Sequence, residues 1–146
     1  MEELQRAAKV AFASEYSFFI KAQNFHWNVE GSDFLEYHEL FGKIYEEVYG
    51  NIDAFAEQIR ALGAYAPASF QKFSMLSQIE DENNILDRAA MCAELLEDSL
   101  KIAKILKLTF QRSEEFQEYG FSDFVASRLD AHRKHQWMLR SSLKNG

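Results

Sequence analysis

Turn-forming residues and cysteine are scarce in this chain of 146 residues. It contains six glycines and one proline, too few to connect the many short strands of an all-β sandwich or barrel. Its one cysteine, Cys92, excludes an internal disulfide and a cysteine-rich zinc module. No apolar run comes near the roughly 18 residues that cross a bilayer, so we expect no membrane segment.

Basic charge is also in short supply. The chain has 16 basic and 23 acidic residues and a net charge of −7, so it lacks the overall basic character of nucleic-acid-binding proteins. An acidic surface attracts cations, including metal ions. The first residues, Met1 to Arg6, contain no apolar signal region. Together with the single cysteine, this favours a cytoplasmic location.

Apolar residues recur every three to four positions through most of the chain, which predicts long helices. Glu15 interrupts the apolar face of the first helix. It is either a carboxylate of the bundle core or an interface, or an edge residue that reaches solvent, which is the interpretation we favour. Gly42 and Gly50 lie inside the second helix, where glycine suggests the close approach of a neighbouring helix or is merely tolerated. The predicted long helices cover residues 3–28, 33–62 (N-cap Ser32 or Asp33), 82–111 with Ile85 inward, and 122–143 (N-cap Ser122), and a short helix covers Phe70–Leu76.

These elements predict an all-α fold. Four long helices joined by two short turns and one long crossover make a four-helix bundle. A single crossover of this kind, between the second and third long helices, is typical of ferritin-like topology. Residues 1–146 are predicted to form a single domain, because the length suits one core and no linker interrupts the pattern.

Two histidines flank the first predicted turn. His26 and His38 each lie six residues from residue 32, so in an antiparallel hairpin they sit at the same level and face one another. Opposed imidazoles can share or adjoin a divalent metal. The alternative is that His38 is a core histidine with a satisfied hydrogen bond and His26 is merely its neighbour.

A pair of acids follows on the second helix. Asp53 and Glu57 are spaced i, i+4 and project from one face. Carboxylates combined with imidazoles suit iron, manganese or zinc, although such pairs are also common on solvated surfaces. Asp53 lies 15 residues beyond His38, roughly 22 Å along the helix. One chain therefore cannot bring all four residues to one metal, whereas a two-fold partner can, and it would create two equal sites.

The combined pattern resembles the Dps family of mini-ferritins. The similarity rests on Phe25-His26-Trp27-Asn28-Val29-Glu30-Gly31, on the spacing His-x11-His-x14-Asp-x3-Glu, on Arg128-Leu129-Asp130-x-His132 and on Trp137-Met138-Leu139-Arg140.

The resemblance implies a hollow dodecamer with a ferroxidase centre at each two-fold interface. His26 and His38 of one subunit and Asp53 and Glu57 of its mate would bind two irons. Fe(II) would be oxidised there, preferably by hydrogen peroxide, and stored as ferric oxide, which protects DNA. Trp27 would lie beside the centre, as a radical trap or as interface packing. Asp123 would border a cation-admitting pore at a three-fold axis, or it belongs to a solvated loop.

One position departs from the family pattern. Many members carry an aspartate four residues after the second histidine, where this chain has Gly42. We therefore expect the second iron to bind weakly, with water or Glu46 in place of the missing ligand. Zinc or manganese are the expected substitutes for iron at these ligands. Two other interpretations stay open. The first is a Dps-shaped shell with an impaired metal centre that coats DNA or shields cells, and the second is a bundle with a structural zinc at the same residues.

The remaining candidates are weaker. We interpret His132 and His135 as structural, because the sequence places no carboxylate convincingly beside them. Glu39, Glu46 and Glu47 either face the cavity and nucleate mineral or are ordinary surface charges. DNA binding is expected to be weak or absent, because few basic residues lie near either end of the chain.

Overall fold

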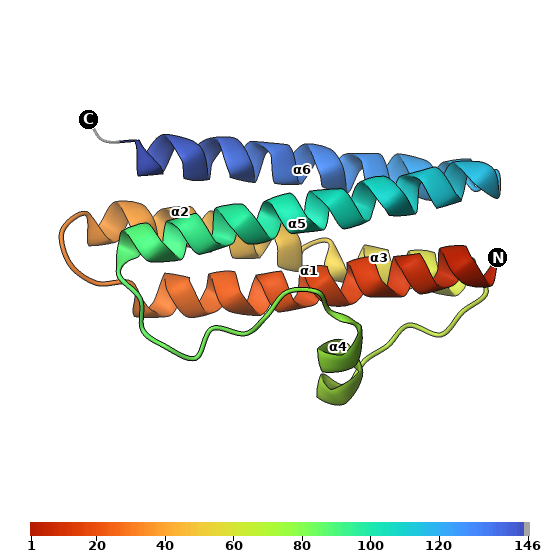
Figure 1. The fold of residues 1–146 in the computed structure, drawn as a ribbon, viewed down its shortest axis with the longest axis horizontal. Helices are drawn as coiled ribbons and strands as arrows, with labels where there is room; N and C mark the ends of the chain where they lie inside the picture. The colour runs from red at the N-terminus through yellow and green to blue at the C-terminus, as the bar shows by residue number, and fades with distance from the viewer. Residues whose placement is uncertain (145–146) are drawn as a thin grey trace.

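The structure is a computed structural model in which residues 1–144 are described. Over these residues it is all-helical, and it confirms the predicted bundle with a short helix in one long crossover (Figure 1). No helix in this part of the chain is long and apolar enough to cross a membrane. The helices are α1 (Glu2–Asn28), α2 (Phe34–Tyr49), α3 (Ile52–Ala61), α4 (Phe70–Leu76), α5 (Arg88–Glu115) and α6 (Tyr119–Leu143).

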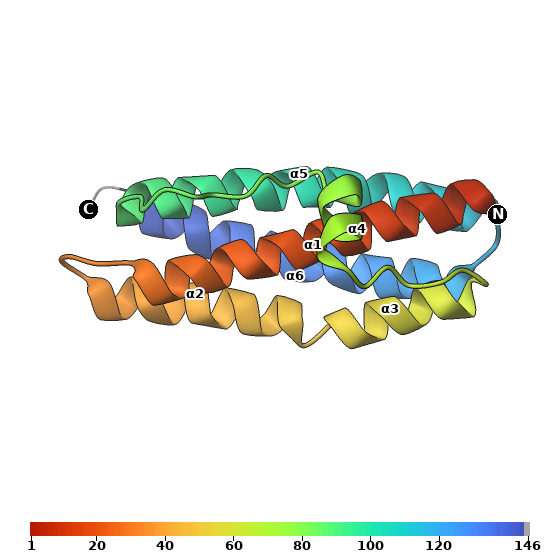
Figure 2. The same cartoon turned by 90° about the horizontal axis from the view of Figure 1, so that it is seen from below.

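The crossover between α3 and α5 sets the topology. It returns the chain along the bundle, so α5 runs parallel to α2 and α3, whereas α1 and α6 run the other way (Figures 1 and 2). Contacts with α1 hold the crossover in place. The rings of Tyr16 and Phe73 stack with their centroids 4.4 Å apart, and the backbone N–H of Gln78 donates to the hydroxyl of Ser14 at 3.0 Å.

The prediction of one continuous helix over residues 33–62 is wrong, because the helix is interrupted at Gly50 and Asn51 (Figure 2). The side-chain amide of Asn51 donates to the carbonyl of Glu47 at 2.9 Å, and its own backbone N–H turns to the carbonyl of Val48. The amide thus replaces a helical backbone bond and ends the helix. A Cβ at Gly50 would meet only the carbonyl oxygens of Glu46, at 3.2 Å, and Glu47, at 3.7 Å, among the described residues. Both belong to the same helix, so the neighbouring helix expected at Gly50 does not approach it.

Two other predicted helix starts are also wrong. The third long helix begins at Arg88 rather than Glu82, because the carboxylate of Asp87 caps it by accepting from the backbone N–H of Ala90 at 2.8 Å. Ile85, predicted to point inward, precedes this cap and is exposed. Ser122 is not an N-cap: α6 begins at Tyr119, and the buried Ser122 hydroxyl lies 2.7 Å from that of Ser113.

A buried ion-pair cluster joins α1, α2 and α6. Arg128 is 1% exposed; its Nε donates to Glu15 at 2.7 Å, and a terminal nitrogen donates to Glu47 at 2.5 Å. The Nε2 of His132 bonds to Glu15, and the Nε2 of His135 bonds to Glu47 at 2.8 Å. Glu15 is therefore buried, not at a solvent edge, and both histidines do have a carboxylate beside them. The cluster makes the histidines part of the internal framework.

The same cluster keeps both glutamates ionised. Burial alone would raise the pKa of Glu15, but the charges of His132 and Arg128 and their hydrogen bonds lower it to about 2. Burial likewise opposes ionisation of Glu47, and hydrogen bonds from His135 and Arg128 lower its pKa to about 2. Glu47 is thus half-buried and its carboxylate is held by Arg128 and His135, which corrects its interpretation as an ordinary surface charge. Its role in mineral nucleation stays a prediction.

Replacing Glu15 by Gln should lower the free energy of unfolding by about 3 kcal/mol, because it leaves the buried Arg128 short of a counter-charge. An unfolded glutamate has a pKa of about 4.3, so as the pH falls the unfolded chain binds protons before the folded one does. The stabilisation is full above about pH 5 and is lost as the pH falls toward 2. Denaturant unfolding measures this loss. The difference in free energy of unfolding between wild type and Glu15→Gln should be smaller at pH 4 than at pH 7.

Glu97→Gln is the control for this comparison. Glu97 lies on α5 with its side chain 72% exposed, and its replacement should change stability by less than about 0.5 kcal/mol. Equal losses from the two substitutions would contradict the role given to the cluster.

Candidate metal centre

His26, near the end of α1, and His38, near the start of α2, face each other across the first turn. Their ring centroids are 3.8 Å apart and their planes differ by 13°, so the predicted pairing of the two imidazoles is confirmed. Phe34 stacks on His38 at 5.1 Å. Gly31, at φ +100°, supplies the turn conformation that brings the two helix ends together.

Each imidazole is held by the backbone of the opposite helix. The Nδ1 of His26 lies 2.6 Å from the carbonyl oxygen of His38, and the Nδ1 of His38 lies 2.6 Å from the carbonyl oxygen of His26. Because a carbonyl only accepts, both rings carry their hydrogen on Nδ1, and the neutral rings keep a lone pair on Nε2. Among residues 1–144, neither Nε2 has a hydrogen-bond partner. Metal-binding histidines use the same arrangement.

Gly42 lies against this pair, one helical turn beyond His38. A Cβ at this position would lie 2.8 Å from Nδ1 and 2.9 Å from Cε1 of His26. The close approach expected at Gly42 is therefore real, and it is made by a side chain of α1.

Asp53 and Glu57 lie on α3 and are both exposed. The pKa of the Glu57 carboxyl is raised, because its protonated form can donate a hydrogen bond to Asp53 and its ionised form is repelled by the charge of Asp53. A cation between such groups relieves their repulsion. Asp53 also lines a pocket of about 870 Å³ between α1, α3 and the crossover.

The imidazoles and the carboxylates do not meet within one subunit. His38 and Asp53 stand roughly 22 Å apart along α2 and α3. No group of three or more histidine, cysteine or acidic side chains suited to a metal ion forms within residues 1–144. Within the described residues the two imidazoles and the two carboxylates thus form separate pairs, and their joint role at one metal stays a prediction.

Large apolar side chains are exposed close to both half-sites. Trp27 follows His26 and is 64% exposed, while Phe70 and Tyr49, which line the pocket of Asp53, are 85% and 57% exposed. Exposed aromatic side chains such as these are enriched at protein–protein contacts. Both halves of the candidate centre therefore lie on surface suited to a partner.

The other predicted residues are scattered. Asp123 and Glu46 are exposed on α6 and α2. Glu39 is exposed as well and lies 3.4 Å from the ammonium of Lys43. The roles expected of these three stay predictions.

Basic side chains gather at one place that the sequence analysis overlooked. They line a groove of about 770 Å³ between α1 and α5, and they are Arg6, Lys101, Lys104, Lys107 and Arg112. The prediction of weak DNA binding rests on the net charge of the whole chain and on its ends, and it stays a prediction.

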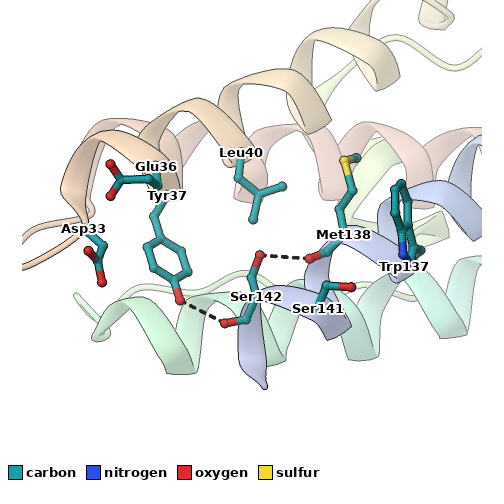
Figure 3. Close-up of a pocket in the computed structure, with 8 residues that line it drawn as sticks. All are labelled: Asp33, Glu36, Tyr37, Leu40, Trp137, Met138, Ser141 and Ser142. Carbon is teal, nitrogen blue, oxygen red and sulfur yellow. Dashed lines mark hydrogen bonds between the residues drawn. The ribbon is translucent and has the colours of Figure 1, made fainter. Parts of the chain in front are cut away.

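A further pocket of about 460 Å³ lies between the start of α2 and the end of α6 (Figure 3). The hydroxyl of Tyr37 donates to the carbonyl of Ser142 at 3.1 Å and ties the two helices together. Asp33 lies at one end of the pocket and Trp137 at the other (Figure 3). None of the predicted metal ligands lines it.

Known proteins resemble this chain in sequence and in fold. Residues 7–146 match the ferritin-like domain family. The chain is 33% identical over 134 residues to an uncharacterised low temperature-induced protein of Nostoc sp., covering 90% of this chain and 75% of that protein. It is 30% identical over 125 residues to DNA protection during starvation protein 2 of Bacillus anthracis, covering 86% of each.

Solved structures agree with these matches. Dps from Thermosynechococcus elongatus superposes with a TM-score of 0.96 at 22% identity, covering 99% of this chain and 92% of that one. A Dps protein from Bacillus brevis gives a TM-score of 0.94 at 25% identity, covering 98% and 96%.

The hydrogen bonds predict opposite tautomers for the two histidine pairs. His26 and His38 donate through Nδ1 to carbonyls, whereas His132 and His135 donate through Nε2 to glutamates. Nitrogen-15 spectra of histidine-labelled, metal-free protein at mildly alkaline pH should therefore show two rings of each kind, and His26→Gln should remove one Nδ1–H signal. Four Nε2–H rings would rule out the proposed ring orientation.

Proposed function

The chain belongs to the ferritin-like domain family and has Dps proteins as relatives, and on this basis we propose that it oxidises Fe(II) at centres shared by two subunits and stores the ferric product. The observation that carries the proposal is the stacked pair of His26 and His38. Both rings are locked by Nδ1–H bonds to backbone carbonyls, and both keep an Nε2 lone pair. Such rings are oriented for a metal before it arrives.

Each centre takes two halves from different chains. His26 and His38 of one subunit supply nitrogen ligands, and Asp53 and Glu57 of its two-fold mate supply oxygen ligands. Imidazole and carboxylate together suit iron in both oxidation states, with zinc or manganese as substitutes. The mutual repulsion of Asp53 and Glu57 favours the binding of a cation between them.

The iron is the substrate of this chemistry. Two Fe(II) ions each give one electron to one hydrogen peroxide molecule, the O–O bond breaks, and two protons are taken up as two waters form. Consuming peroxide and Fe(II) together prevents hydroxyl-radical formation and thereby protects DNA without contact. Trp27 is the proposed neighbour of the centre, either as interface packing or as a radical trap. Because Gly42 supplies no carboxylate, the second iron is the more weakly held of the two.

The assembly we propose is a hollow dodecamer located in the cytoplasm. The exposed apolar side chains beside both half-sites support a two-fold interface there, since burying them would stabilise the pair. Asp123, exposed on α6, is the proposed cation-attracting residue of the three-fold pore.

Size-exclusion chromatography with iron detection tests this function. Twelve chains of 17.0 kDa should elute near 204 kDa, about the size of a closed cage. After Fe(II) and peroxide are added to metal-free protein, iron should co-elute at tens of atoms per subunit. A cage that retains almost no iron would instead favour a shell with an impaired centre, and one tightly bound zinc per subunit would favour a structural metal.

Mixing two inactive variants tests the shared centre. One variant carries His26→Ala and His38→Ala, and the other carries Asp53→Ala and Glu57→Ala. Each alone should lack iron oxidation. When the two are unfolded and refolded together, random pairing leaves about a quarter of the centres intact, because one of the two centres in each mixed pair is complete.

Recovery of about a quarter of the wild-type oxidation rate is the expected result. The matched control is each variant refolded alone. A mixed assembly that forms but recovers no activity would contradict a centre built from two chains.

A further inference from the structure

Gly42 is buried on α2, on the same face as His38 and directly against the ring of His26. A Cβ there would come within 2.8 and 2.9 Å of two ring atoms, well inside the roughly 3.5 Å at which carbon atoms make contact. Any side chain at this position therefore requires the ring or the helix to move.

The ring has little freedom to give way. Its Nδ1–H bonds to the His38 carbonyl at 2.6 Å, and its plane stacks on His38 with centroids 3.8 Å apart. The ring of Tyr45 lies close by, with its centroid 5.1 Å away. Displacing His26 would break the bond to the carbonyl and redirect its Nε2 lone pair.

We propose that Gly42 is the positioning residue of His26: its missing side chain leaves the space in which the His26 imidazole is locked for metal binding. The inference rests on the proposed function, in which His26 is a ligand. It gives position 42 a meaning that the sequence pattern alone does not. The glycine is more than a missing carboxylate, because in this chain the ring of His26 occupies the space that a side chain at position 42 would take.

Helix stability argues in the same direction. A helix with glycine in its interior is less stable than the same helix with alanine. In α2 this glycine lies at a buried position in contact with a candidate ligand. Gly120, in the first turn of α6, provides the matched comparison, because a Cβ there would meet no atom within 4 Å.

Titration of the metal-free assembly with Co²⁺ alone tests the proposal, with the cobalt absorption spectrum reporting the ligands. Gly42→Ala should weaken Co²⁺ binding by about tenfold or more, the range seen when a group that orients a metal ligand is lost. Gly120→Ala should bind as wild type does. Nitrogen-15 spectra of Gly42→Ala should also show loss of the His26 Nδ1–H bond, which a general loss of stability would not produce.

A double-mutant cycle keeps the test decisive where Gly42→Ala folds poorly. In the wild-type background the substitution should lower the melting temperature, because the new methyl group meets the ring. In a His26→Ala background the ring is absent, so the same substitution should raise the melting temperature, as alanine ordinarily does in a helix.

The outcomes separate the two proposals. If wild type binds Co²⁺ and Gly42→Ala binds it equally well, the role of Gly42 is overturned. If assembled wild type binds no Co²⁺, the proposed function fails, and the His26 signal together with the cycle still decides whether Gly42 positions the ring. A melting temperature that changes by the same amount in both backgrounds would also overturn the inference.

Discussion

This bundle depends on the ion pairs that the buried guanidinium of Arg128 makes with two glutamates. The guanidinium donates to Glu15 on α1 and to Glu47 on α2 at once, so one side chain of α6 ties both arms of the first hairpin. A charge removed from water is tolerated only with such partners. The same hairpin carries His26 and His38 on its two arms, where their rings stack.

The backbone then completes what the ion pairs begin. Reciprocal bonds from each imidazole to the opposite carbonyl leave both Nε2 atoms free, while the acidic residues Asp53 and Glu57 lie too far along the same arm to reach them. The geometry thus separates nitrogen and oxygen ligands within one chain. A centre that uses both needs a second copy, which makes assembly a part of the chemistry we propose.

Much of the fold was predictable because it depends on local spacing. The bundle, the crossover with its helix at Phe70–Leu76 and the pairing of His26 with His38 all follow from helical periodicity and from distance to a turn. The errors arise where a side chain competes with the backbone or reaches a distant partner. Asn51 takes a carbonyl and interrupts a helix, whereas Ser122 looks like a cap and instead pairs with Ser113.

The sequence by itself therefore determined the helical bundle, the order of its long arms, and the two histidines and two acids with the spacing of a Dps protein. Only the tertiary structure decided that Glu15 is buried, which nitrogen of each imidazole carries the hydrogen, and what glycine does at position 42. The physical reason is that periodicity reports neighbours on one helix. Glu15 and Arg128 stand 113 residues apart, and His26 meets Gly42 across two helices, so packing alone brings these groups together.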